Sequence, residues 1–298
     1  RVPHPVLIGH AASLTPYAPQ ADGLCAPQVE LQQSDYMWVF QLYKDRNVAA
    51  QLEALEGLCR PILQNQDPKA PSHETLQKLA ELVVKVLEAT VQNQSYYYRV
   101  RCRAAELLGE LAVQGESSGV LTLHKVAHQL CVDEETQLPF PNDFSDLSQY
   151  FVRRSCLEAL AGAREAPGAD VFKLLLLLLK HNDNSESEMS DGDYVATLLR
   201  CLARATPNTS VVDKTNKQIQ RYMQRDRLMP SFGHAVTCAA LDAMQHLQSR
   251  GIVRFDPAPF LAHAKVGQSS KIRAAALGCL ARLTPLNLSI LKLLLMVC

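Results

Sequence analysis

The sequence predicts an all-α fold, an α-solenoid of antiparallel helix pairs, and three observations favour it. Apolar residues recur with the 3.6-residue period of a helix through most of the 298 residues. No convincing alternating stretch, as a strand would show, follows residue 33. An alanine- and leucine-rich helical pattern also returns several times along the chain, which is typical of repeat proteins.

Residues 1–33 differ from the rest. They are rich in proline and lack a helical period. We therefore expect them to be the end of a preceding β domain or a linker, with PQVELQQ at 27–33 as a candidate last strand. The helical repeat domain is expected to span 34–298. Since the chain begins at Arg1 rather than Met, we expect a piece of a longer protein or a processed form.

Each expected helix follows a stripe of apolar residues on one face. Early stripes include Val48, Leu52, Leu55 and Leu58, then Leu76, Leu79, Val83 and Leu87. Loops are expected where proline and acidic residues cluster, at 60–72, 133–146, 182–193 and 206–211. The expected helices are, in order, 35–44, 46–59, 73–92, 96–113, 119–132, 147–165, 169–181, 193–205, 212–227, 230–250, 257–266, 269–282 and 286–297.

A weak internal repeat links these helices. The pattern RNVAAQLEALEGL at 46–58 returns five times, and its aligned positions are 36 to 56 residues apart. Those positions are Leu55, Leu111, Leu160, Leu202, Met244 and Leu280. The spacing favours two-helix, HEAT-like units. One such pair cannot bury its apolar face alone, so stacked pairs share a continuous core. We expect Trp38, the only tryptophan, to be a structural anchor at the end of that core.

The composition excludes several classes of protein. Lysine plus arginine and aspartate plus glutamate both number 30, so no overall charge points to nucleic acid or an anionic membrane. Nine cysteines without a CxxC pair indicate a reducing compartment, the cytosol or nucleus. The longest apolar run, 174–179, lies between two lysines and is too short to span a bilayer.

Catalytic and cofactor motifs are missing from the sequence. It contains no HExxH, P-loop, GxGxxG or GxSxG, so we predict no catalytic residue and no cofactor. One stretch, HKVAHQLC, places His124, His128 and Cys131 on one helix face. This is a weak zinc candidate, because a structural site needs four ligands and a single helix seldom supplies three.

Small groups of basic residues are candidates for contact with a partner or with DNA phosphate. The candidates are Arg99, Arg101, Arg103, Arg153, Arg154, Lys271 and Arg273, and Arg221, Arg225 and Arg227 form a further basic group. Solvated helix ends and ion pairs are the simpler interpretation, because no aromatic residues interleave with them. The segment 181–193 holds five acids and no lysine or arginine, and we expect it to be an acidic loop.

Several stretches resemble one family, in the same order along the chain. SDYMWVFQLYKDRNVAAQLEAL is the most specific, followed by KHNDNSESEMSDGDY. YYYRVRCRAAELL, LSQYF, LMPSFGHAVTCAALDAMQHLQSRG and DPAPFLAHAKVGQSSKIRAAALGCL add to the likeness. Together they resemble the C-terminal region of the TFIID subunit 2 family, TBP-associated factors related to M1 aminopeptidases. The resemblance covers about 30 to 283 and weakens in 114–146.

This resemblance implies ERAP-type, HEAT-like repeats and a scaffold role without enzymatic activity. The family implies a nuclear location and partnership with TBP and other TBP-associated factors within TFIID, for initiation by RNA polymerase II. Promoter DNA would be engaged mainly through other parts of the protein, and no membrane is implied.

Two other interpretations stay open. The chain could be the C-terminal helical domain of an active M1 zinc aminopeptidase whose catalytic residues lie upstream, or a free-standing HEAT adaptor. Without the resemblance, the residues predict an α-solenoid that acts through interactions.

Overall fold

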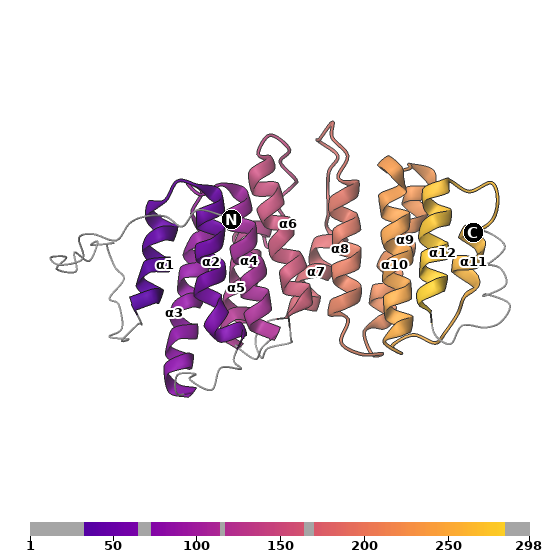
Figure 1. Cartoon of the computed structure of the whole chain (residues 1–298). Helices are drawn as coiled ribbons and strands as arrows, with labels where there is room; N and C mark the ends of the chain where they lie inside the picture. Colours follow the sequence, from indigo (N-terminus) through magenta and orange to yellow (C-terminus); the bar gives the residue numbers. More distant parts are fainter. Residues whose placement is uncertain (1–32, 65–72, 114–116, 164–169, 284–298) are drawn as a thin grey trace, which may run out of the picture. The chain divides into compact units, whose positions relative to one another are not determined.

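The computed structural model describes residues 33–64, 73–113, 117–163 and 170–283 (Figure 1). Within these ranges the chain forms α-helices and one 3-10 turn, and no strand. This confirms the predicted all-α class. The helices are α1 (Gln33–Lys44), α2 (Val48–Leu63), α3 (His73–Gln92), α4 (Tyr98–Val113), α5 (Ser117–Cys131), α6 (Leu147–Gly162), α7 (Val171–Lys180), α8 (Gly192–Ala205), α9 (Val212–Leu228), η1 (Phe232–His234), α10 (Ala235–Ser249), α11 (Ala258–His263) and α12 (Ser270–Arg282).

Two helix boundaries differ from the prediction for clear reasons. We expected a loop from residue 60, but α2 continues through Pro61 to Leu63. The proline lies in the last turn, and the helix still ends with a hydrogen bond from Gln64 N to Arg60 O. We expected a helix over 230–250, but α10 begins at Ala235, because Gly233 and His234 have φ of 62° and 55°.

Some expectations fall outside the described residues. These are the helix over 286–297 and the non-helical segment 1–32. The candidate strand at 27–33 also lies outside them, except for Gln33, which begins α1. A preceding domain that ends near residue 33 therefore stays a proposal.

Short polar side chains fix where several helices begin. The Asn47 side chain accepts a hydrogen bond from Ala49 N at the start of α2. Asp146 and Asp170 do the same for the first turns of α6 and α7. Each cap satisfies a backbone N–H that has no partner inside its helix.

The helices are arranged in two layers. In one layer α2, α4, α6, α8, α10 and α12 each pack against the next, and they follow one another in chain order in Figure 1. In the other layer α3 packs against α5, α5 against α7, and α7 against α9. Helices of the second layer also contact their chain neighbours in the first. This is the stacking of antiparallel pairs that the repeat predicts.

The repeat positions lie in the core between the layers. Five of the six aligned residues are buried and Met244 is half-buried. One apolar cluster extends from α1 to α10, and a second joins α10, α11 and α12. A buried leucine contributes about 1.5–3 kcal/mol relative to an exposed one, so the repeated leucines stabilise each pair through its neighbours.

Small residues bring neighbouring helices close together. A Cβ on Gly109 of α4 would lie 3.0 Å from the carbonyl oxygen of Ala159 of α6. The seven described cysteines are unpaired thiols, and five of them are buried in the core like small apolar residues. None of the described helices combines the length and apolar character needed to cross a membrane.

Candidate interaction surfaces

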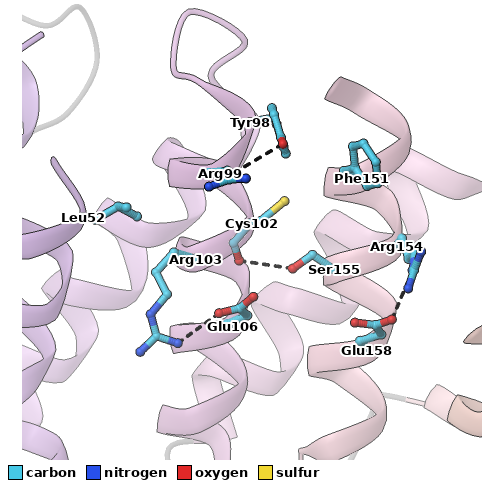
Figure 2. A pocket seen from close by; sticks show the side chains of 10 residues that line it. All are labelled: Leu52, Tyr98, Arg99, Cys102, Arg103, Glu106, Phe151, Arg154, Ser155 and Glu158. Carbon is cyan, nitrogen blue, oxygen red and sulfur yellow. Dashed lines mark hydrogen bonds and ion pairs between the residues drawn. The ribbon is translucent and has the colours of Figure 1, made fainter. Parts of the chain in front are cut away.

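A groove opens between α4 and α6, with Leu52 of α2 at its side (Figure 2). Its volume is about 450 Å³. One wall is aromatic, because the rings of Tyr98 and Phe151 stack with centroids 5.4 Å apart. The Ser155 hydroxyl donates to Cys102 O at 3.3 Å and ties the two helices together. The groove is therefore a formed feature of the helix stack.

Most charged side chains that line the groove form ion pairs with one another. Arg103 donates to Glu56 of α2 at 2.7 Å, and to Glu106 and Glu110 of its own helix at 3.0 and 2.7 Å. Burial disfavours the charge of Arg103, but these three hydrogen bonds outweigh it and raise the pKa of the guanidinium. Arg154 pairs with Glu158 at 3.2 Å.

Arg99 differs from Arg103 and Arg154, the other two arginines of the groove. It pairs with no carboxylate among the described residues, and its Nε donates to the Tyr98 hydroxyl at 3.4 Å. Figure 2 shows this bond beside the aromatic wall. An incoming carboxylate or carbonyl group could accept from Arg99 while an apolar side chain rests on Tyr98 and Phe151.

The thiol and the hydroxyl that line the groove, on Cys102 and Ser155, are not activated for chemistry. Burial raises the pKa of the Cys102 thiol to about 11, so this sulfur is not an activated nucleophile near neutral pH. The Ser155 hydroxyl is used in its bond to a carbonyl. Across the described ranges, no group of three or more His, Cys, Asp or Glu could hold a metal ion.

The structure brings three of the predicted basic residues into this groove: Arg99, Arg103 and Arg154. It corrects two others. Arg101 is 3% exposed and donates to Val91 O and the Gln149 side chain. Arg153 is 6% exposed and donates to Phe140 O and Pro141 O. Both guanidinium groups bind neighbouring segments of the chain, so neither can meet a phosphate at the surface.

The last two predicted cations lie on α12, away from the groove residues in sequence and helix. The Lys271 ammonium lies 5.4 Å from the ring centroid of Phe232. The Arg273 side chain donates to Ala264 O at 3.4 Å. Lys271 therefore belongs to a different surface, around the turn between α9 and α10, whereas Arg273 lies against the end of α11.

On α5 the two histidines of the zinc candidate are half-buried, and its cysteine lies in the core. The rings of His124 and His128 are 6.4 Å apart between centroids, and Cys131 is completely buried. Burial raises the pKa of the Cys131 thiol. Burial also lowers the pKa of His124, and the nearby His128 lowers it further by a smaller amount. Zinc binds a thiolate, which this site disfavours. The interpretation as two histidines on a half-buried face fits the structure better.

Trp38 is half-buried and lies on α1 against α2. The face of α1 around it is apolar and exposed, with Tyr36, Met37, Phe40 and Tyr43 each at least half exposed. The structural anchor expected at residue 38 therefore lies beside an open apolar surface at this end of the helix stack.

The structure extends one basic group of the sequence, Arg221, Arg225 and Arg227, into a longer cationic surface. Lys214, Lys217, Arg221 and Arg225 are exposed along α9. Their spacing of three or four residues places them on one side of the helix. The basic residues of 212–227 are visible in the sequence, but their shared exposure depends on which face of α9 packs against α8 and α10.

Fold and surfaces together define a class of protein, a helical-repeat protein whose exposed features suit contacts with other macromolecules. A family model described as TAF2-like, TPR repeats matches residues 35–297, and the chain belongs to this family. The family description calls the repeats TPR repeats, whereas their spacing in the sequence suggested HEAT-like units. Both kinds of repeat are stacked antiparallel helix pairs.

Curated relatives agree with the family resemblance. The chain is 29% identical over 282 residues to transcription initiation factor TFIID subunit 2 of Gallus gallus, a match covering 88% of this chain and 23% of the relative. It is 29% identical over 270 residues to the protein of the same name from Schizosaccharomyces pombe, covering 83% and 22%. The Saccharomyces cerevisiae protein of that name is 24% identical over 236 residues, covering 76% and 16%. The chain thus spans less than a quarter of the length of these relatives.

Proposed function

We propose that this chain is a non-catalytic scaffold segment of the general transcription factor TFIID in the nucleus, where it helps TBP-associated factors and TBP assemble. The name of its relatives, TFIID subunit 2, supports the assignment to TFIID. The stacked helix pairs support the scaffold role, because such a stack offers long, stiff surfaces for partner segments.

The single observation that carries the scaffold role is the groove between α4 and α6. Three arginines line it, but Arg103 and Arg154 are already paired with carboxylates. A phosphodiester backbone would meet those carboxylates, and like charges side by side are costly. A polypeptide segment suits the groove better, since it can place an apolar side chain on Phe151 and an acceptor on Arg99.

Promoter DNA is proposed to bind mainly through other parts of the protein. Two of the basic residues first considered for phosphate contact are buried, and those in the groove are partly neutralised. Phosphate contacts determine how strongly affinity falls with salt. We therefore expect DNA affinity and its salt dependence to be the same in the wild type and in Arg99→Gln.

Affinity purification of the full-length protein from nuclear extract tests the function. The wild type should recover TBP and its associated factors. Arg99→Gln and Phe151→Ser should each lower recovery of one partner while helicity stays unchanged by circular dichroism. Lys85→Gln, an exposed change on α3, is the matched control. A purification without any TBP-associated factor would overturn the TFIID proposal, and full recovery with both groove variants would overturn the role of the groove.

A further inference from the structure

The turn between α9 and α10 presents large apolar side chains to solvent. Leu228, Met229 and Phe232 are 83%, 72% and 92% exposed. Single exposed apolar residues are ordinary, but three of them within five positions form a patch. We call these three residues the apolar tip.

The turn that carries the apolar tip is held rigidly. Buried Asp226 accepts hydrogen bonds from Ser231 N at 2.7 Å, from Thr237 N at 3.1 Å and from the Thr237 hydroxyl. Val236 N donates to the Ser231 hydroxyl at 3.2 Å. The chain then reverses through two residues with positive φ, of which only Gly233 is a glycine. Such a preorganised turn loses little entropy when a partner binds.

A hollow of about 270 Å³ opens beside Met229 of the apolar tip. Its lining is part apolar, from Val195, Tyr222, Met229 and Val236, and part polar, from Ser190, Ser231 and charged residues. Its two carboxylates are buried and already accept hydrogen bonds, Asp191 from the Asn182 side chain and Asp226 as described. The hollow can therefore receive an apolar side chain without leaving a carboxylate unpaired.

Three exposed cations lie around the apolar tip. Arg225 lines the hollow, Arg227 precedes the tip, and Lys271 lies beside Phe232. All three side chains are exposed, and none forms an ion pair within the described ranges. Hydrogen bonds from Ser185 lower the pKa of Asp183 in the acidic loop, and the charge of Arg225 adds a smaller lowering. This loop would therefore compete with an acidic ligand for Arg225.

We propose that the apolar tip and the hollow beside it are a docking site for an acidic, amphipathic segment of a partner protein. An apolar side chain of that segment enters the hollow beside Met229 while another rests on Phe232, and its carboxylates pair with Arg225 and Lys271. The inference rests on the proposed scaffold function. It uses a different surface from the α4–α6 groove, so the two can fail separately.

Fluorescence polarisation on the purified full chain tests the site. The probe is a labelled synthetic peptide that alternates acidic residues with leucine and phenylalanine. Three comparison probes separate the contributions: the same peptide with serine at each apolar position, the same peptide with glutamine at each acid, and duplex DNA. The acidic amphipathic peptide should bind more tightly than all three.

Variants assign the binding to the tip. Phe232→Ser and Met229→Ser should each raise the Kd roughly tenfold, as expected for apolar anchors. Because both side chains are exposed, neither change should unfold the chain. Lys271→Gln should raise the Kd and weaken its salt dependence, whereas Asp183→Asn should lower the Kd. Leu121→Ser on α5 and Lys85→Gln on α3, both exposed, are the matched controls and should bind as the wild type does.

Three results would overturn the proposal. One is no binding of the acidic amphipathic peptide up to millimolar concentration. Another is equal binding of the serine-substituted peptide or of DNA, which would make the surface a general site for polyanions. The third is an unchanged Kd for Phe232→Ser. None of these results alters the recovery of TFIID components, which tests the proposed function on its own.

Discussion

The indole ring of Trp38 lies directly over the backbone of Gly57, where a Cβ atom would be only 2.5 Å from its Cε2. The contact joins α1 to α2 at the first helix pair, and it leaves no room for a side chain at residue 57. Since Trp38 is the only tryptophan, its fluorescence reports this contact alone.

Gly57→Ala should therefore displace α1. Overpacking of this kind costs about 1–3 kcal/mol, and the tryptophan emission should shift to the red as the ring moves toward water. Chemical denaturation and the emission spectrum give both readouts. Gly162→Ala, at a glycine with open space around it, is the control and should change neither. Unchanged emission in Gly57→Ala would show that the ring does not rest on Gly57.

Trp38→Ala tests the same contact from the other side. A fully buried tryptophan would cost about 3–5 kcal/mol, but Trp38 is half-buried. We expect a smaller loss in the free energy of unfolding, at the low end of that range or below it. A loss as large as that of a fully buried tryptophan would contradict the half-buried position of the ring.

Arg103 links α2 to α4 through three carboxylates. Its side chain is 25% exposed, so Arg103→Gln should lower the free energy of unfolding by about 1 kcal/mol. High salt should shrink the difference from the wild type. Lys173→Gln is the control, because Lys173 pairs with Asp170 but its own side chain is 81% exposed. Equal effects of both changes would contradict a special role for the Arg103 cluster.

Asp226 should make the turn between α9 and α10 sensitive to acid. Burial alone would raise its pKa, but hydrogen bonds from Thr237 and Ser231 outweigh burial and lower it. A carboxyl group with a lower pKa in the folded chain stabilises the fold above its unfolded pKa. That contribution is lost as the pH falls through the folded pKa.

Asp226→Asn should then be less stable than the wild type at neutral pH, by about 1–3 kcal/mol. The two should converge as the pH falls below the ordinary carboxyl pKa, about 3.9, and through the lower pKa of the folded chain. Urea denaturation across this range measures the difference, with exposed Asp213→Asn on the same helix as control. A constant difference between Asp226→Asn and the wild type at all pH values would contradict the assigned role of the ionised carboxylate.

The fold could be predicted because burial repeats within each helix. The leucines at 55, 111, 160, 202 and 280 all reach the core, and a period of 3.6 residues is visible in one sequence. The start of α10 was missed because it depends on two left-handed residues, one of them His234. Non-glycine residues seldom adopt that conformation, so sequence alone gave little sign of it.

The surfaces were harder to predict because they depend on other segments. Arg99 and Arg101 are alike in the sequence, yet Arg101 is held by Val91 and Gln149, which are 10 and 48 residues away. The groove likewise needs Tyr98 and Phe151 from two repeats. Only the packing of α4 on α6 brings them together. Charge patterns predicted candidates, and packing decided which of them reach the surface.

The most direct test of the scaffold role places a photo-crosslinking phenylalanine derivative at Phe151 of the full-length protein. The protein is then assembled with its nuclear partners, irradiated, and analysed by mass spectrometry of the crosslinked peptides. We predict crosslinks to a segment of another TFIID subunit, and their loss when Arg99 is also changed to glutamine. Crosslinks only to DNA, or only within this chain, would contradict the role of this groove as a binding surface for partner proteins.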